Sequence, residues 1–263
     1  MKSNGKQVII TGASTGIGRE LTKLFLADGY RILGVSQRQE GLRELQQQLD
    51  PKQNLLSTLS LNLAAPDAAK SLYDYAKSNL DDVDVLVNNA GFACYGPFID
   101  TDTEKLNSML QLNVVTLTEL CHSFGNDMKQ RGQGSIINVG STAGMMPMEN
   151  FAAYGASKSY INALSYSMRA ELAPYNVQVT CVTPAAVATS FAATANIDKA
   201  EGNSLLKRLF DSGRVSTPDE IAADAYKGFK QNKAQVLTGK NAWIAVLAPL
   251  LIPQRMLPRM FKM

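Results

Sequence analysis

The chain has 263 residues, of which 45% are hydrophobic and 19% charged, and its formal net charge is +3. This composition is ordinary for a soluble globular protein, and no basic tract in the first 240 residues indicates nucleic acid as a partner. A single histidine, His122, excludes a multi-histidine metal site and any Ser-His-Asp or Cys-His catalysis that does not use it, so we expect no metal. Three widely spaced cysteines without metal-ligand spacing indicate a reducing compartment and predict a cytoplasmic protein.

Short apolar runs alternate with segments of helical periodicity along most of the chain. The predicted strands cover residues 7–11, 31–35, 55–61, 83–87, 135–139, 178–182 and 235–238. The predicted helices cover residues 17–28, 39–49, 66–79, 103–131, 152–173 and 218–231. Strands that are apolar on both faces are typical of a parallel sheet covered by helices, so the pattern predicts one doubly wound α/β domain with a seven-stranded parallel sheet over residues 1–240.

Two stretches depart from this alternation. Residues 185–216 are too long for an ordinary connection, and we expect a mobile lid over a site there. Residues 241–263 form an apolar, basic C-terminal extension, and its uncharged run over 242–254 is too short to span a bilayer as a helix. For residues 243–263 three interpretations stay open: a peripheral contact with anionic lipid, a lid or dimer element, or a tail packed on the domain's own surface.

A glycine-rich turn follows the first strand. The sequence TGASTGIGRE over residues 11–20 places Gly12, Gly16 and Gly18 in a G-x-x-x-G-x-G spacing. Glycines permit a tight turn and a close approach of the backbone, and the N-terminus of the next helix attracts a pyrophosphate. The turn predicts a dinucleotide site, with a glycine-rich turn that binds no ligand as the alternative.

A tyrosine and a lysine stand four residues apart in the sequence YGASK. On a helix over 152–173, Tyr154 and Lys158 lie on one face, about one turn apart. Ser141 ends the fifth predicted strand, 13 positions before Tyr154. On their own, these residues also fit an amphipathic helix and a serine that caps a turn.

The motifs TGASTGIG at 11–18, NNAG at 88–91, Ser141 and YGASK at 154–158 occur in this order and resemble the short-chain dehydrogenase/reductase family. The resemblance extends over roughly residues 5–240 and implies a Rossmann-type fold and an oxidoreductase that uses a nicotinamide cofactor. It implies that Tyr154 is the general acid or base and that Ser141 holds the substrate oxygen. It further implies that Lys158 hydrogen-bonds the nicotinamide ribose and lowers the pKa of Tyr154.

Asn113, in the sequence QLNVV, occupies the family's active-site asparagine position. The resemblance implies that its side chain helps to hold a water that joins Lys158 to solvent. The alternative is an amide in a helix interior that bonds to backbone.

The resemblance also implies which residues hold the cofactor. They are Gly12, Ser14, Thr15, Gly16, Ile17, Gly18, Gln37, Arg38, Asn62, Leu63, Asn89, Ala90, Gly91, Tyr154, Lys158, Pro184, Val187 and Thr189. Ser36 stands where NAD-preferring relatives carry an acidic residue, and Arg38 could pair with a 2′-phosphate. We therefore expect NADP(H), with NAD(H) as the alternative.

The predicted substrate wall is apolar, which suggests a small hydrophobic, lipid-like ketone, aldehyde or alcohol. Its residues are Phe92, Met145 and Phe191, beside Ser141 and Tyr154, with Cys94, Met146 and Met148 close by in the sequence. The resemblance favours a homodimer or homotetramer built through the helices at 103–131 and 152–173. Two other functions stay open: a non-catalytic nucleotide-sensing or regulatory protein on the same fold, and an NAD-preferring alcohol dehydrogenase.

Overall fold

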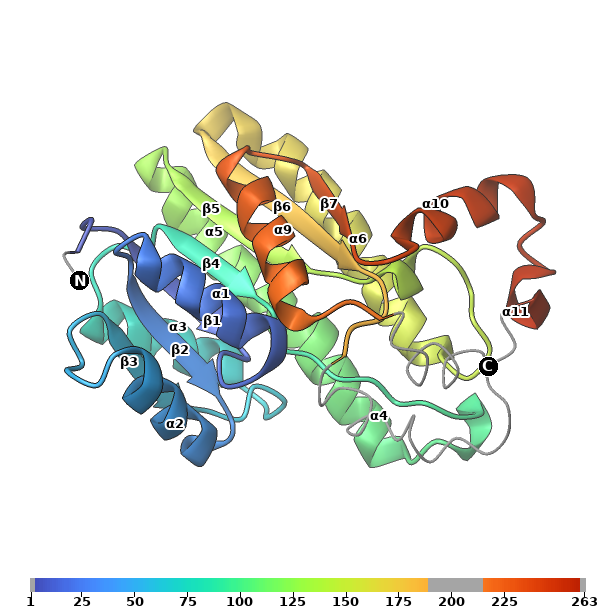
Figure 1. Ribbon diagram of the computed structural model, residues 1–263, viewed down its shortest axis with the longest axis horizontal. Coiled ribbons are helices and arrows are strands. Elements are labelled where there is room, and N and C mark those ends of the chain that lie inside the picture. Colours follow the sequence, from blue (N-terminus) through green and yellow to red (C-terminus); the bar gives the residue numbers. More distant parts are fainter. Residues whose placement is uncertain (1–2, 189–214, 261–263) are drawn as a thin grey trace.

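A computed structural model describes residues 3–188 and 215–260 (Figure 1). Within these residues, seven strands form one parallel sheet in the order β3-β2-β1-β4-β5-β6-β7. The strands are β1 (Gln7–Thr11), β2 (Arg31–Ser36), β3 (Leu56–Ser60), β4 (Val85–Asn88), β5 (Gly134–Val139), β6 (Val177–Pro184) and β7 (Gln235–Thr238). The predicted doubly wound α/β fold is confirmed. The strand order changes direction between β1 and β4, and ligands of such sheets bind beyond the carboxyl ends of the strands at this point.

Helices cover both faces of the sheet (Figure 1). They are α1 (Gly16–Ala27), α2 (Gln39–Leu49), α3 (Ala68–Asn79), α4 (Thr103–Leu110), α5 (Leu117–Arg131), α6 (Ala152–Leu172), α9 (Pro218–Lys230), α10 (Ala242–Leu251) and α11 (Leu257–Met260). Because side chains alternate along a strand, Val8 and Ile10 of β1 pack into the core beneath α1, α2 and α9. Ile9 packs into the other core, beneath α3, α5 and α6.

The predicted helix over 103–131 is interrupted in the structure. Between α4 and α5 the chain forms wider π-helical turns over Gln111–Thr116. Such turns insert one residue into a helix and often occur at functional sites. The apolar periodicity could not reveal them, because they shift the register by a single residue. Asn113 lies within these turns, and its side chain is buried.

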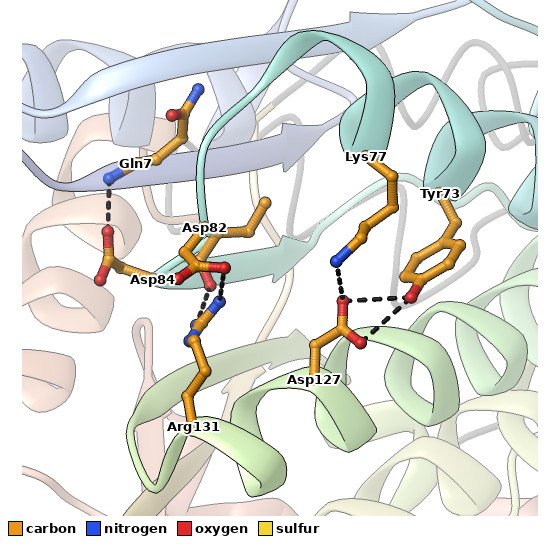
Figure 2. Close-up of polar contacts among 8 residues, drawn as sticks. Gln7, Tyr73, Lys77, Asp82, Asp84, Asp127 and Arg131 are labelled. Carbon is orange, nitrogen blue, oxygen red and sulfur yellow. Dashed lines mark hydrogen bonds and ion pairs between the residues drawn. The ribbon is translucent and has the colours of Figure 1, made fainter.

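Figure 2 shows polar contacts that fix the amino-terminal edge of the sheet. The carboxylate of Asp84 accepts a hydrogen bond from the backbone N–H of Gln7 at 2.7 Å. Arg131, at the end of α5, donates to the carbonyl oxygen of Val83 at 2.7 Å and pairs with Asp82 at 3.0 Å. These contacts lie where the strands begin. The opposite side of the sheet, at the carboxyl ends of the strands, is left for a ligand site.

The C-terminal segment begins with α10, which packs against β7 and against the 3₁₀ turn Thr142–Gly144. It buries small side chains, those of Ala242, Ala245 and Ala248. Its outer face exposes large apolar side chains: Trp243, Val246, Leu247, Leu250 and Leu251. No helix within residues 3–188 and 215–260 is long and apolar enough to cross a membrane.

Candidate active site

The turn between β1 and α1 requires its glycines. Gly12 and Gly16 have φ angles of 67° and 55°, in the region that favours glycine. At Gly18, a Cβ atom would lie 2.3 Å from the carbonyl oxygen of Gly12 and 2.5 Å from Nδ2 of Asn89, so a side chain does not fit. The helix N-terminus therefore lies close against the turn.

Thr11 ties this turn to the end of β4. Its Oγ1 donates to the carbonyl oxygen of Val87 at 3.2 Å and accepts from the backbone N–H groups of Asn89 and Ala90, each at 3.0 Å. Asn89 Nδ2 returns a hydrogen bond to the carbonyl oxygen of Thr11 at 2.8 Å. The structure thus brings two predicted cofactor residues, Asn89 and Ala90, beside the glycine turn. Thr11 was not predicted as a site residue, although it is the first residue of the glycine motif.

A cleft of about 680 Å³ opens beside the turn. It is lined by Ser14, Thr15, Gly16, Arg19, Arg38, Gln39, Glu40, Gly41, Glu44, Ala188 and Pro218. Thr15 precedes α1 without a side-chain capping bond, and the first turn of α1 holds no acidic residue. The N–H groups of that turn are thus available to an anion, and Arg38 and Arg19 add two cations. The cleft fits a phosphorylated nucleotide, and Arg19 is a residue that sequence analysis did not single out.

Other predicted cofactor residues follow the carboxyl ends of their strands. Gln37 and Asn62 are exposed just beyond β2 and β3, while Leu63 is buried and its carbonyl oxygen accepts from Thr116 Oγ1 at 2.8 Å. Ile17 lies in α1, and Gly91 follows β4. Pro184 ends β6, and Val187 follows it three residues later. Thr189, Phe191 and most of the predicted lid over 185–216 lie outside the described residues.

Ser141, Tyr154 and Lys158 meet at the end of β5. The Ser141 hydroxyl lies close enough to the Tyr154 phenol to lower its pKa, and Ser141 Oγ accepts from the backbone N–H of Ala143 at 3.0 Å. Lys158 lies one turn after Tyr154 on α6; its Nζ donates to the carbonyl oxygen of Val139 at 2.8 Å. This Nζ is 5.8 Å from the centre of the Tyr154 ring. Both side chains are buried, with 7% of Tyr154 and 5% of Lys158 exposed.

Burial dominates the acid–base properties of this pair. It raises the pKa of Tyr154 to about 12, and the hydrogen bond with Ser141 opposes that rise. It lowers the pKa of Lys158 to about 8, so most of this side chain is still an ammonium at pH 7. The expected lowering of the Tyr154 pKa by Lys158 is not found in the protein alone, where burial and the Ser141 hydroxyl are the two causes that act on the phenol.

Asn113 lies in the same site but bonds to a neighbouring loop. Its Nδ2 donates to the carbonyl oxygen of Phe92 at 2.9 Å, and its Oδ1 accepts from the Phe92 N–H at 3.2 Å. A Cβ atom at Gly91 would lie 3.0 Å from this Oδ1 and 3.5 Å from Lys158 Nζ, so the three residues are neighbours. The amide therefore holds the loop after β4, and the water that it was expected to hold stays a prediction.

An apolar cluster surrounds Tyr154. Its buried members are Ala93, Cys94, Met109, Ala143, Phe151 and Tyr154. The predicted substrate residues Phe92 and Met148 pack against it, and Met145 is half-buried just after the 3₁₀ turn. Phe151, whose ring centre is 5.6 Å from that of Tyr154, was not predicted. Within the described part of the chain, no three His, Cys, Asp or Glu side chains gather as metal ligands would.

The sequence profile of the short chain dehydrogenase family matches residues 6–200. The chain belongs to this family. It is therefore a short-chain NAD(P)-dependent dehydrogenase/reductase, an oxidoreductase of alcohol and carbonyl groups. Family membership favours the enzyme over the non-catalytic alternative.

Several relatives match along most of their length. D-threitol dehydrogenase of Mycolicibacterium smegmatis is 30% identical over 84% of this chain and 85% of its own. NADPH-dependent 3-dehydrocapnine reductase of Ornithobacterium rhinotracheale is 29% identical over 97% of this chain and 96% of its own. A short-chain dehydrogenase from Sphingobium yanoikuyae, solved in complex with NADPH, is 27% identical over 88% of this chain and 87% of its own, with a TM-score of 0.78.

Proposed function

We propose that this protein is an NADP(H)-dependent oxidoreductase that interconverts a hydrophobic ketone or aldehyde with its alcohol in the cytoplasm. The observation that carries the proposal is the buried contact of Ser141 with Tyr154, with the Lys158 ammonium one helical turn away. This arrangement joins a proton donor, a hydrogen-bond donor for the same oxygen and a positive charge.

A bound nicotinamide cofactor supplies or accepts the hydride. Tyr154 donates its phenolic proton to the substrate oxygen in reduction and removes the hydroxyl proton in oxidation. Ser141 Oγ accepts from Ala143, so its own hydrogen can donate to the substrate oxygen. With a pKa of about 12 for Tyr154, the phenol enters the reductive direction already protonated at pH 7. In oxidation it must lose this proton, which the ammonium of Lys158 favours.

The preference for NADP(H) is supported by two arginines in the cleft beside the glycine turn. Arg38 and Arg19 line it, and a 2′-phosphate is a good partner for a guanidinium. Ser36 carries no charge and bonds instead to Ser14 at 2.8 Å. Glu40 and Glu44 line the same cleft and oppose this preference, so NAD(H) is the alternative. The two relatives named with NADPH support NADP(H).

The substrate class follows from the side chains around Tyr154. Relatives are named for substrates as different as D-threitol and 3-dehydrocapnine, so they do not decide it. The cluster that contains Phe92, Phe151 and Met148 offers apolar contacts and flexible thioether packing. We therefore assign a hydrophobic carbonyl compound to this site.

We assign α10 to a peripheral contact with anionic lipid. Leu250 and Leu251 are 75% and 79% exposed, and Trp243 is 58% exposed, on a helix whose other face is packed through alanines. No acidic residue follows Asp224. The basic residues after it are Lys227, Lys230, Lys233, Lys240, Arg255, Arg259 and Lys262. An apolar helix face in an acid-free, basic segment matches an anionic bilayer surface, and α10 lies beside the turn that follows Ser141.

Sedimentation with vesicles of phosphatidylcholine and phosphatidylglycerol tests this contact. Deletion of residues 244–263 should reduce binding to the vesicles. The variant Tyr175→Ser is the control, because this side chain is 40% exposed on another element. Unchanged sedimentation would refute the lipid contact, and a simultaneous change in oligomeric mass would indicate that α10 covers a second copy of the chain instead.

A homodimer or homotetramer is part of the proposal. Tyr160 and Tyr166 on α6 and Val115 beside α5 are about two-fifths exposed. Thr118 Oγ1 and the Tyr160 hydroxyl lie 2.9 Å apart, so the two helices present one continuous surface. Light scattering after gel filtration measures the subunit count, and a monomeric mass would refute this part.

The catalytic proposal is tested by fluorescence titration with NADPH and NADH, followed by a series of 2-ketones from 2-butanone to 2-decanone monitored at the nicotinamide absorbance. We expect tighter binding of NADPH and a kcat/KM that rises with chain length. Turnover limited to the shortest or hydroxylated ketones would refute the hydrophobic substrate class.

A further inference from the structure

The inward face of α6 remains polar beyond Lys158. Tyr154, Lys158 and Asn162 follow one another at intervals of four residues, so they form one row along the helix. Ser165 continues this buried face. Asn162 is 6% exposed, and burial of an amide requires hydrogen-bond partners.

The partners of Asn162 lie on the segment that carries Ser141. Its Nδ2 donates to the carbonyl oxygen of Ser141 at 3.2 Å. Its Oδ1 accepts from the Cys181 thiol, with a sulfur-to-oxygen distance of 3.5 Å. A Cβ atom at Gly140 would lie 2.1 Å from this Oδ1, so the amide packs directly on the backbone before Ser141.

Ser141 follows β5 at the point where backbone hydrogen bonds to the neighbouring strand β6 stop. The backbone N–H of Gly140 still bonds to the carbonyl oxygen of Val182 at 2.8 Å. Beyond it the chain turns away, and the carbonyl oxygen of Ser141 accepts from the N–H of Gly144 at 3.1 Å within the 3₁₀ turn. Asn162 is thus a side-chain anchor on Ser141 from the helix that also carries Tyr154 and Lys158.

We propose that Asn162 is a positioning residue, which holds the backbone of Ser141 so that its hydroxyl meets both the Tyr154 phenol and the substrate oxygen. The inference rests on the proposed function, because it acts through Ser141. A displacement of about 1 Å in such a site can cost about a hundredfold in rate. The amide fixes this geometry without touching substrate.

The variant Asn162→Leu removes both hydrogen bonds and keeps the number of side-chain heavy atoms. The matched control is Ser165→Ala, on the same buried face: Ser165 Oγ accepts from Asn138 Nδ2 at 3.0 Å and does not bond to Ser141. The assay is reduction of 2-decanone, or of the ketone with the highest kcat/KM, together with the Kd for NADPH and the Tm of each protein.

We expect Asn162→Leu to lower kcat by roughly tenfold to a hundredfold, with the Kd for NADPH changed less than about twofold. Ser165→Ala should lose a comparable amount of Tm and keep kcat within about twofold. An unchanged kcat in Asn162→Leu, or an equal loss in Ser165→Ala, would overturn the proposal. If Asn162→Leu does not fold, Asn162→Ala removes the same amide without adding an apolar side chain.

A double-mutant cycle with Ser141→Ala separates this inference from the proposed function. If Asn162 acts through Ser141, the double variant should be no slower than Ser141→Ala alone. A second loss of the same factor would overturn the positioning role. The acidic limb of kcat/KM for oxidation, which reports the enzyme without substrate, should also move to higher pH in Asn162→Leu, because the Ser141 hydroxyl lowers the pKa of Tyr154 in that state. Full activity of Ser141→Ala would instead refute the catalytic assignment of Ser141.

Discussion

The buried charge of Lys158 should destabilise the folded protein. The ammonium is buried, and burial lowers its pKa from 10.5 to about 8. This difference of about 2.5, at 1.36 kcal/mol per pKa unit, corresponds to about 3 kcal/mol between the folded and unfolded states. Below pH 8 both states carry the charge, and the full cost is present. Between pH 8 and 10.5 the unfolded chain binds more protons than the folded protein, so the free energy of unfolding rises with pH through this window.

The variant Lys158→Met removes this dependence. Its free energy of unfolding minus that of the wild type should fall by about 3 kcal/mol between pH 7 and 10.5. The loss of the bond to Val139, worth about 1.5–3 kcal/mol for a charged donor, lowers this difference at pH 7 but adds little to its pH dependence. Tyr154 is present in both proteins, so its own titration at higher pH cancels in this difference.

Urea unfolding at intervals of half a pH unit measures this difference. Lys233→Met, at an exposed lysine, is the control for the loss of one lysine. A difference between Lys158→Met and wild type that stays constant within about 0.5 kcal/mol from pH 7 to 10.5 would refute the reasoning, because a desolvated ammonium must show the linkage.

Three further predictions concern the cofactor and the lipid contact. Arg38→Ala should raise the Kd for NADPH at least about tenfold and leave the Kd for NADH nearly unchanged. The control Arg43→Ala, at an exposed arginine that does not line the cleft, should change neither Kd. Equal effects of Arg38→Ala on both cofactors would discredit the 2′-phosphate contact. Gly18→Ala should abolish NADPH binding, measured by fluorescence, because its Cβ atom meets the Gly12 carbonyl oxygen at 2.3 Å; retained affinity would show that the turn can open. Leu250→Ser/Leu251→Ser should lose sedimentation with anionic vesicles while keeping NADPH binding, and undiminished sedimentation would count against α10 as the contact.

Local sequence patterns were sufficient for most of the fold. The bounds of β1 and β7 agree with the predicted 7–11 and 235–238 at both ends, because these apolar runs are flanked by residues that favour turns. The break between α4 and α5 was not predictable, since the π-helical turns shift the helical register by a single residue, which leaves the apolar periodicity almost unchanged.

The support of the site was less visible in the sequence than its reactive groups. The roles expected for Ser141, Tyr154 and Lys158 came from motif order, but the burial that raises the pKa of Tyr154 depends on the whole apolar cluster. Thr11 contacts Asn89, 78 positions away, and Asn162 contacts Ser141, 21 positions away. Short-range sequence periodicity does not predict such pairs.

The central claim is that Tyr154 is the proton donor. The most direct test is Tyr154→Phe, which keeps the ring in the apolar cluster and removes only the hydroxyl. We expect kcat for ketone reduction with NADPH to fall by about 10²- to 10⁴-fold, while the Kd for NADPH changes less than about threefold. A variant that binds NADPH and reduces the same ketone at the wild-type rate would show that Tyr154 is not the proton donor.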